Sequence, residues 1–231
     1  RAWMGTQRDG MWAAALAAHA MSRQNGKGDE IQARELYGLI VLEEAIIHTS
    51  HEMPTTVSAF QRLESVFQTN ADLRRKVRKF RSANGEQAIE MHSGAFIRYR
   101  ARTGGGGRGL DDISLVVYDE AQHLQPEHLA ASSPTLAVNP NAQVVLAGSA
   151  GLASSQVWWD VRKDALRGVG GRFSFVEHGA EDIGINSDGE IESIKPDPHD
   201  PRTWAQGNPA YGRRITGDFL RSQLRLMGES L

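Results

Sequence analysis

Apolar runs alternate with amphipathic stretches along the chain, and this pattern predicts buried strands separated by helices. Residues 11–21 (MWAAALAAHAM) are continuously apolar and end at a turn, as a buried central strand does. Residues 29–42 follow with acidic residues in the first turn, where the helix dipole favours them. Their apolar positions share one helical face: Ile31, Leu36, Leu39 and Ile40. The chain is therefore expected to open as strand, loop and helix.

The next segments continue the pattern. Residues 43–50 (EEAIIHTS) are expected to be a second strand, and residues 53–67 a helix with Pro54 in its first turn. Residues 72–82 (DLRRKVRKFRS) are also expected to be helical. Two short strands, AIEMHS and AFIRYR, flank Gly94 as a hairpin. The tract TGGGGRG at residues 103–109 cannot pack into a core and is expected to be a flexible loop.

Two more continuous apolar runs have the texture of parallel strands that are buried on both faces. The first, ISLVVY, ends in Asp119 and Glu120, and the second is AQVVLAGSA at residues 142–150. A helix (VWWDVRKDAL) and a further strand (RFSFVEHGA) follow. These elements predict an α/β protein with a mainly parallel central sheet flanked by helices.

The texture changes after residue 180. A hairpin-like turn (INSDGEI) and a proline-rich segment (KPDPHDP) precede an amphipathic helix that begins at Thr216. We therefore expect a core over residues 1–180 and a small lid or linker subdomain over residues 181–231.

Composition narrows the possible functions. The 231 residues, 40% of them hydrophobic, are enough for one sizeable core, and the absence of cysteine excludes disulfides and thiolate metal sites. The longest apolar run is too short to span a bilayer. The net charge of −2 means that any nucleic-acid contact must be a local basic patch. Six of the eight residues from 74 to 81 are basic, and such a run fits a DNA or subunit contact and a solvated face equally well.

Residues 22–28 (SRQNGKG) carry the candidate chemistry. The phosphate-binding pattern G-x-x-x-x-G-K-[ST] matches at Gly26 and Lys27, whereas Met21 replaces the first glycine and Gly28 replaces the hydroxyl residue. Lys27 stands at the predicted start of a helix, where anions bind readily. Taken alone, this match is weak.

A second motif strengthens it. Asp119 and Glu120 end a predicted buried strand downstream of the strand, Gly-Lys loop and helix. ATP hydrolysis needs a carboxylate that holds Mg²⁺, which Asp119 fits, and a general base for the attacking water, which Glu120 fits. Ser149, at the end of the next strand, is placed to sense the γ-phosphate.

Taken together, S-R-Q-N-G-K-G, V-V-Y-D-E-A-Q and L-A-G-S-A resemble the ATPase half of the large terminase subunit of tailed bacteriophages, the motor that pumps DNA into the procapsid. The segments IIHTSHEMPTTVSAFQRL and TWAQGNPAYGRRIT are similar to that family too, so the resemblance covers most of the chain. It implies a P-loop NTPase fold of the additional-strand, catalytic-glutamate type. The loop and the Asp119 strand would be its Walker A and Walker B motifs, with ATP and Mg²⁺ as cofactors.

The resemblance also implies residue roles. Arg23 would contact the γ-phosphate, and Arg108 would be an arginine finger for a neighbouring subunit, with Arg102 as the second candidate. Gln7 would read adenine. Asp119 and waters would hold the metal, since Gly28 offers no ligand. The nucleotide would contact the loop: Ser22, Arg23, Gln24, Asn25, Gly26, Lys27, Gly28 and Asp29.

The partners implied are double-stranded DNA, the portal protein, the small terminase subunit and further copies of the chain in a ring, without a membrane. The implied location is the host cytoplasm, with transient docking on the procapsid. The family's C-terminal nuclease domain is not expected within these residues, so neither is DNA cleavage.

Two alternatives remain open. D-E-A-Q-H also resembles the box of superfamily-two helicases, although a second RecA-like domain is missing from this sequence. A module that binds nucleotide only to hold an assembly together would explain Gly28, although Lys27, Asp119 and Glu120 are all intact.

Overall fold

A computed structural model describes residues 5–7, 9–82, 86–102, 112–180, 182–185, 187–188, 190–194 and 196–227. Its centre is an eight-stranded sheet in the order β3-β4-β5-β2-β6-β7-β1-β8, in which the six strands from β5 to β8 are mutually parallel. The strands are β1 (Leu16–Ala20), β2 (Ala45–Ser50), β3 (Val77–Arg81), β4 (Gln87–Met91), β5 (Phe96–Ala101), β6 (Leu115–Asp119), β7 (Gln143–Gly148) and β8 (Phe173–Glu177). The expected mainly parallel α/β sheet is confirmed.

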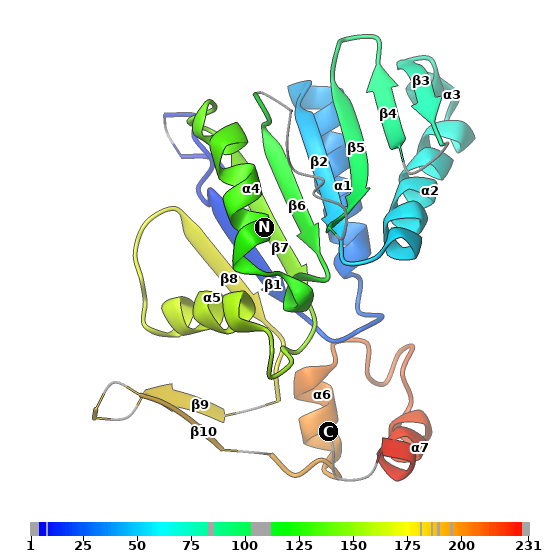
Figure 1. Cartoon of the computed structure of the whole chain (residues 1–231). Coiled ribbons are helices and arrows are strands. Elements are labelled where there is room, and N and C mark those ends of the chain that lie inside the picture. The colour runs from blue at the N-terminus through cyan, green and yellow to red at the C-terminus, as the bar shows by residue number, and fades with distance from the viewer. Residues whose placement is uncertain are drawn as a thin grey trace.

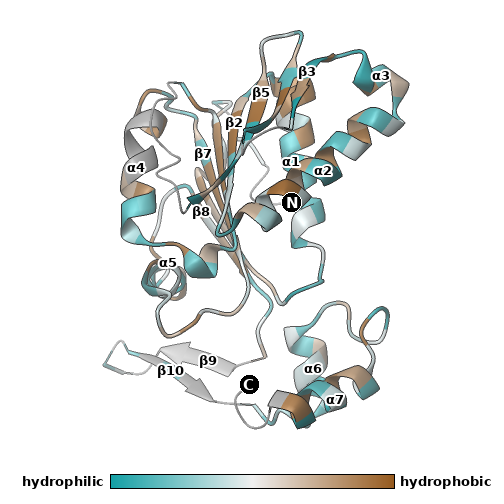
Figure 2. Ribbon diagram, turned by 45° about the vertical axis from the view of Figure 1, so that its right-hand side comes forward, coloured by the Kyte–Doolittle hydropathy of each residue, from teal (hydrophilic) through white to brown (hydrophobic). Residues whose placement is uncertain are grey.

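Helices cover both faces of the sheet (Figure 1). On one face lie α1 (Lys27–Tyr37), which continues into a π-helical turn (Gly38–Leu42), and α2 (Met53–Thr69). On the other face lie α4 (Pro126–Ala137) and α5 (Gln156–Leu166). Each face has its own apolar core, the first around Phe60 and Phe67 and the second around Trp158. Figure 2 shows the apolar strands between the two helical layers.

The expected helix over residues 72–82 is wrong. Only a short helix, α3 (Ala71–Arg74), forms there, and β3 follows as the antiparallel edge strand of the sheet. The register of β3 against β4 shifts between Val77 and Lys79. A bulge of this kind lets Val77 and Phe80 face the same core despite their spacing of three, which imitates a helical pattern.

Helix α4 was not anticipated from the sequence. It begins with Pro126 in the first turn and with a capping box, in which Gln125 and His128 satisfy each other's backbone amides. The predicted strands and the helices α1, α2, α5 and α7 are otherwise confirmed, within a few residues at their ends.

The C-terminal segment contains the two-stranded hairpin β9 (Asp182–Ile185) and β10 (Ile191–Ile194), followed by α6 (Pro201–Gly207) and α7 (Gly217–Met227). Both helices lie beyond the carboxyl ends of the parallel strands (Figure 1). Thr216 opens α7 as expected, because its hydroxyl accepts a hydrogen bond from Phe219 N at 3.2 Å. The division of the chain at residue 180 stays a prediction.

Candidate functional site

The predicted site residues converge at the carboxyl edge of the sheet. The loop at residues 22–27 follows β1, Asp119 and Glu120 end β6, and Ser149 follows β7. In the sheet β6, β7 and β1 are parallel neighbours, so their carboxyl ends lie side by side. Ligands of open α/β sheets bind at this edge.

The loop is held in the shape that the glycine-lysine pattern predicts. Gln24 and Gly26 have positive φ angles of 61° and 95°, and Lys27 is the first residue of α1. Positive φ is cheap at glycine and costly elsewhere, which explains why Gly26 precedes the helix. The unpaired amides of the first helical turn can receive an anion.

Lys27 folds back onto its own loop. Its Nζ donates to Met21 O at 2.6 Å and to Ser22 O at 3.3 Å. Burial lowers the pKa of Lys27 below its usual value, while Asp119 raises it and Arg23 lowers it. An electrostatic interaction therefore connects the loop lysine to the carboxylate at the end of β6.

The other loop residues divide into two groups. Arg23, Gln24 and Asp29 are at least partly exposed to solvent. Ser22 and Asn25 instead bind the C-terminal segment: Ser22 Oγ donates to Gly207 O at 2.9 Å, and Asn25 Oδ1 accepts from Ala210 N at 2.7 Å. These contacts, made between distant parts of the sequence, hold the segment after α6 against the loop.

Glu120 has an unusual backbone conformation. Its φ of 54° and ψ of 48° lie in the left-handed region, which non-glycine residues adopt at a cost. Its carboxylate accepts long hydrogen bonds from His51 N at 3.3 Å and Thr55 Oγ1 at 3.4 Å. The neighbouring Asp119 Oδ1 accepts from Glu120 N at 2.8 Å. The carboxylate of Glu120 is thus held toward the turn between β2 and α2.

Arg102, at the end of β5, fixes the peptide units around Glu120. Its guanidinium donates to Asp119 O at 2.8 Å, to Glu120 O at 3.0 Å and to Thr49 O at 3.1 Å. Burial lowers the pKa of Arg102 to about 10, so it remains a cation at neutral pH. Because the residue is only 6% exposed and bonds within its own chain, it is not placed to enter a neighbour's site. The second finger candidate is therefore wrong.

Ser149 and Gln122 connect β7 to the turn after β6. Ser149 N donates to Gln122 Oε1 at 3.1 Å, and Met21 N donates to Gly148 O at 3.0 Å. These bonds place Ser149 beside both the loop and the Glu120 turn. Next to Glu120, the rings of His51 and His123 stack with centroids 4.3 Å apart.

Two predicted residues do not join this group. Gln7 lies in a turn whose Gly10 accepts from Asn141, and Asn141 precedes β7 at the opposite, amino-terminal edge of the sheet. The five residues of β1 separate that edge from the loop by about 17 Å. The structure therefore does not bring Gln7 to the loop. Arg108, with the rest of the glycine tract, lies outside the described residues.

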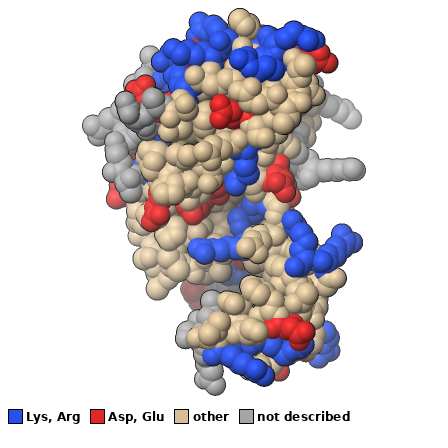
Figure 3. All heavy atoms as spheres, turned by 90° about the vertical axis from the view of Figure 1, so that its right-hand side faces the viewer, with Lys and Arg blue, Asp and Glu red and all other residues tan. Residues whose placement is uncertain are grey.

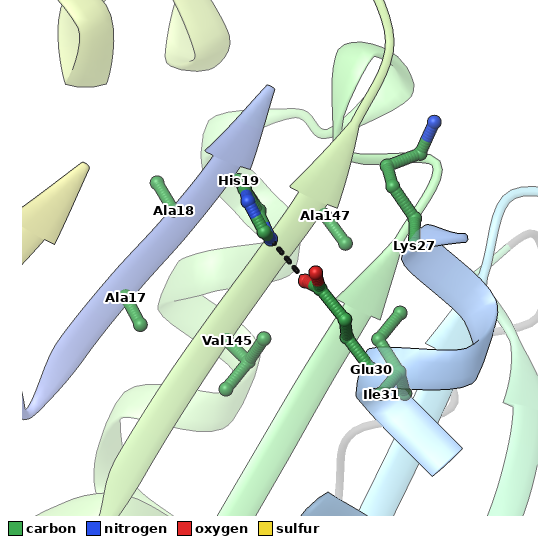
Figure 4. A pocket seen from close by; sticks show the side chains of 8 residues that line it. All are labelled: Ala17, Ala18, His19, Lys27, Glu30, Ile31, Val145 and Ala147. Atoms are coloured by element: carbon green, nitrogen blue, oxygen red, sulfur yellow. Dashed lines mark ion pairs between the residues drawn. The ribbon is translucent and has the colours of Figure 1, made fainter. Parts of the chain in front are cut away.

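A pocket between β1 and α1 lies beneath the loop (Figure 4). In it His19 and Glu30 point toward each other with a contact of 2.6 Å, whereas the amino group of Lys27 points away. Burial lowers the pKa of His19, Glu30 raises it, and His178 lowers it. The rest of the lining is apolar, which fits a packing gap rather than a ligand site.

The described residues include no cluster of three or more His, Cys, Asp or Glu side chains with the spacing of a metal site. Mg²⁺ does not require one, because it keeps several waters and binds phosphates with one or two carboxylates. Asp119 supplies such a carboxylate beside the loop. Two buried polar atoms near it, His48 Nε2 and Ser50 Oγ, have no partner in the described structure, so the residues fit the ion.

Basic side chains gather at the end of the molecule that carries α3 and β3 (Figure 3). Part of this charge is neutralised locally, since Glu90 pairs with Arg78 at 2.7 Å and with Arg81 at 2.6 Å. Among the described helices, none has the length and apolar character needed to cross a membrane.

The structure is similar to solved phage proteins. The HK97 bacteriophage large terminase matches with a TM-score of 0.74 and 17% identity, over 93% of this chain and 43% of that one. The N-terminal domain of the DNA packaging ATPase from bacteriophage phi29 gives 0.51 and 11% (71% and 90% covered). The large terminase of a thermophilic bacteriophage, in complex with ADP, gives 0.50 and 12% (71% and 40%).

The chain thus has the P-loop NTPase fold of large terminase ATPase domains, as the sequence motifs predicted, and spans less than half of the HK97 protein. No protein-family model matches the sequence, and no curated protein matches it. At these identities the likeness concerns the fold, and function has to be argued from the site.

Proposed function

We propose that this chain is the ATPase motor domain of a phage large terminase, which hydrolyses ATP to drive double-stranded DNA into a procapsid. The observation that carries the proposal is the placement of Lys27, Asp119 and Glu120 at neighbouring strand ends, in the fold that large terminases share. The neighbour from the thermophilic phage is in complex with ADP, and the phi29 neighbour is a DNA packaging ATPase.

In this proposal, the phosphates replace the loop carbonyls as partners of Lys27. The β- and γ-phosphates would lie on the amides at the start of α1, and Nζ would turn to them from Met21 O. Arg23, which is exposed beside the loop, would reach the γ-phosphate with its guanidinium fork. Asn25 and Ser22 would pass the change in the loop to the C-terminal segment that they hold.

Glu120 would act as the general base. Its carboxylate has only two long hydrogen bonds in the described structure, so turning it toward a water beside the γ-phosphate costs little. Asp119 would hold Mg²⁺, which neutralises charge on the phosphate oxygens when bound. Arg102 keeps the peptide carbonyls of both acids fixed while the Glu120 side chain moves.

The remaining features of the proposal come from likeness to the neighbours. Residues 1–180 would be the ATPase core and residues 181–231 a lid or linker subdomain. In a ring of copies docked on a portal protein in the host cytoplasm, Arg108 would complete the neighbour's site, and the small terminase subunit would deliver DNA. The basic surface at α3 and β3 would face DNA or the adjacent copy.

The test is Mg²⁺-dependent ATP hydrolysis with duplex DNA, with single-stranded DNA and without DNA, together with displacement of a third strand from a triplex. A packaging motor is expected to be stimulated by duplex DNA and to displace the third strand while the duplex stays paired. Hydrolysis that depends on single-stranded DNA, with separation of the duplex, would favour the helicase alternative. ATP binding without hydrolysis under all three conditions would favour the assembly module.

A further inference from the structure

Two side chains of β2 carry buried polar atoms that nothing in the described structure satisfies. His48 is 1% exposed and its Nε2 has no hydrogen-bond partner, and Ser50 is fully buried with an unpartnered Oγ. Buried polar atoms are nearly always paired in folded proteins, with protein groups or with water. Two such atoms on one strand therefore point to a ligand or bound waters.

Both side chains face the same way as Asp119. His48 is in register with Val117 and Thr49 with Tyr118, so the next step of the parallel ladder sets Ser50 opposite Asp119. Side chains alternate between the two faces of a sheet, which places His48 and Ser50 on the face of Val117 and Asp119. That face is the one covered by α1 and α2.

The protonation of His48 is set from behind. His48 Nδ1 lies 2.5 Å from Glu35 Oε1, and the other carboxylate oxygen of Glu35 accepts from Tyr99 OH at 3.2 Å. A carboxylate partner holds the imidazole proton on Nδ1 and leaves Nε2 as an acceptor. The hydroxyl of Ser50 can also accept. Waters bound to a divalent cation are donors, so they suit both atoms.

Gly28 leaves room above these groups. Asp119, Gly28 and His48 line one small hollow, which also includes Arg62 and Glu35. In the usual loop pattern, a serine or threonine at the position of Gly28 contributes a hydroxyl to Mg²⁺. Here that hydroxyl is missing on the loop, while a buried unpartnered hydroxyl stands on the strand next to Asp119.

We propose that Ser50 Oγ, supported by His48 Nε2, replaces the missing loop hydroxyl by accepting hydrogen bonds from the waters of a Mg²⁺ ion held at Asp119. This proposal rests on the proposed function, because it assigns residues to the metal of the same site. It explains how a loop with glycine at position 28 keeps a complete set of polar partners for the ion. The support comes from β2 rather than from the loop.

The test is Ser50→Ala, with a readout that does not require turnover. Binding of a fluorescent, non-hydrolysable ATP analogue is titrated with Mg²⁺, and the Mg²⁺ concentration for half-maximal enhancement is measured. We expect this concentration to rise about tenfold, as for other residues behind metal ligands. Affinity for the analogue without Mg²⁺ should not change. The melting temperature should not fall, because the substitution removes a buried hydroxyl that has no partner in the described structure.

Two further variants sharpen the test. Ser174→Ala, in β8 at the far edge of the sheet, makes the same atomic change away from the site and should bind Mg²⁺ like the wild type. Gly28→Ser added to Ser50→Ala should restore the lost Mg²⁺ affinity by returning the hydroxyl to the loop. A Cβ at Gly28 would lie 3.3 Å from Nη2 of Arg62, the end of an exposed and flexible side chain that can shift.

The possible outcomes separate this inference from the proposed function. If the wild type shows Mg²⁺-dependent binding and Ser50→Ala matches it, the role of Ser50 is wrong and the proposed ATPase stands. Failure of Gly28→Ser to restore a lost affinity would also contradict the inference. If the wild type binds no nucleotide with Mg²⁺, both proposals fall.

Discussion

Replacing Arg102 with alanine should destabilise the fold and slow hydrolysis, and the structure sets the size of both effects. The change removes three hydrogen bonds from a buried cation to Thr49 O, Asp119 O and Glu120 O. Hydrogen bonds to charged groups are worth about 1.5–3 kcal/mol each, or about 4.5–9 kcal/mol together. Against this stands the cost of burying the guanidinium.

That cost can be set from the pKa of Arg102. Its fall from 12.5 to about 10 corresponds to about 3 kcal/mol at 1.36 kcal/mol per unit. The free energy of unfolding should therefore fall by about 2–6 kcal/mol. For a chain of this length, the lower figure alone lowers the melting temperature by about 4 °C.

The catalytic effect follows from the position of Glu120. Without the bonds to the carbonyls on either side of its peptide, the left-handed conformation at Glu120 loses a major constraint. A displacement of about 1 Å can cost about 100-fold in rate. We expect kcat to fall by about 10- to 100-fold while nucleotide affinity is kept, because Arg102 has no hydrogen bond to the loop in the described structure.

The assays are thermal unfolding, single-turnover hydrolysis and nucleotide binding, each at a temperature where the variant is folded. Arg98→Ala is the control: it lies on the same strand and makes the same change of charge, but it removes only a stacking contact with Phe96. It should cost about 1 kcal/mol or less. An Arg102→Ala protein with unchanged stability and rate would refute the reasoning. Full stability with no activity would instead indicate direct contact with substrate.

Two other predictions concern the loop and the ring. Lys27→Ala should weaken nucleotide binding, and unchanged affinity would reject the loop assignment. The pKa of Lys27 is lowered in the free protein, and phosphates would raise it, so binding takes up a proton above the lowered pKa. Nucleotide affinity should therefore be greatest below that pKa and decline as the pH rises through it, and Lys27→Arg should abolish the decline. If Arg108 acts in a neighbour's site, mixing Arg108→Ala with Lys27→Ala should restore part of the activity, and no restoration at any concentration would argue against the role.

The sequence predicted the parts of the site that lie on regular elements. Continuous apolar runs located β1 and β6, and the residues that follow them, Lys27 and Asp119 among them, had to meet because parallel strands end at one edge. The predicted order of strand, Gly-Lys loop and helix was confirmed for the same reason. These are local patterns with a direct structural consequence.

The sequence did not predict contacts between distant segments. The bond from Ala210 N to Asn25 Oδ1 spans 185 residues, and no local pattern encodes it. Arg102 stands next to a glycine tract and reads as a surface residue, yet its side chain points inward to three carbonyls. The β-bulge at Val77 changed the apparent period of an edge strand from two to three, which made it look helical.

The central claim is that Glu120 is the base of a Mg²⁺-dependent ATPase. The most direct measurement is ATP hydrolysis over a wide range of protein concentration, for the wild type and for Glu120→Gln. The amide oxygen of glutamine can accept the same bonds from His51 N and Thr55 Oγ1, so the variant should fold and bind ATP. We expect the wild-type rate to rise more steeply than the protein concentration, and the variant to lose about 100- to 10,000-fold in rate. Undiminished turnover by Glu120→Gln would contradict the account.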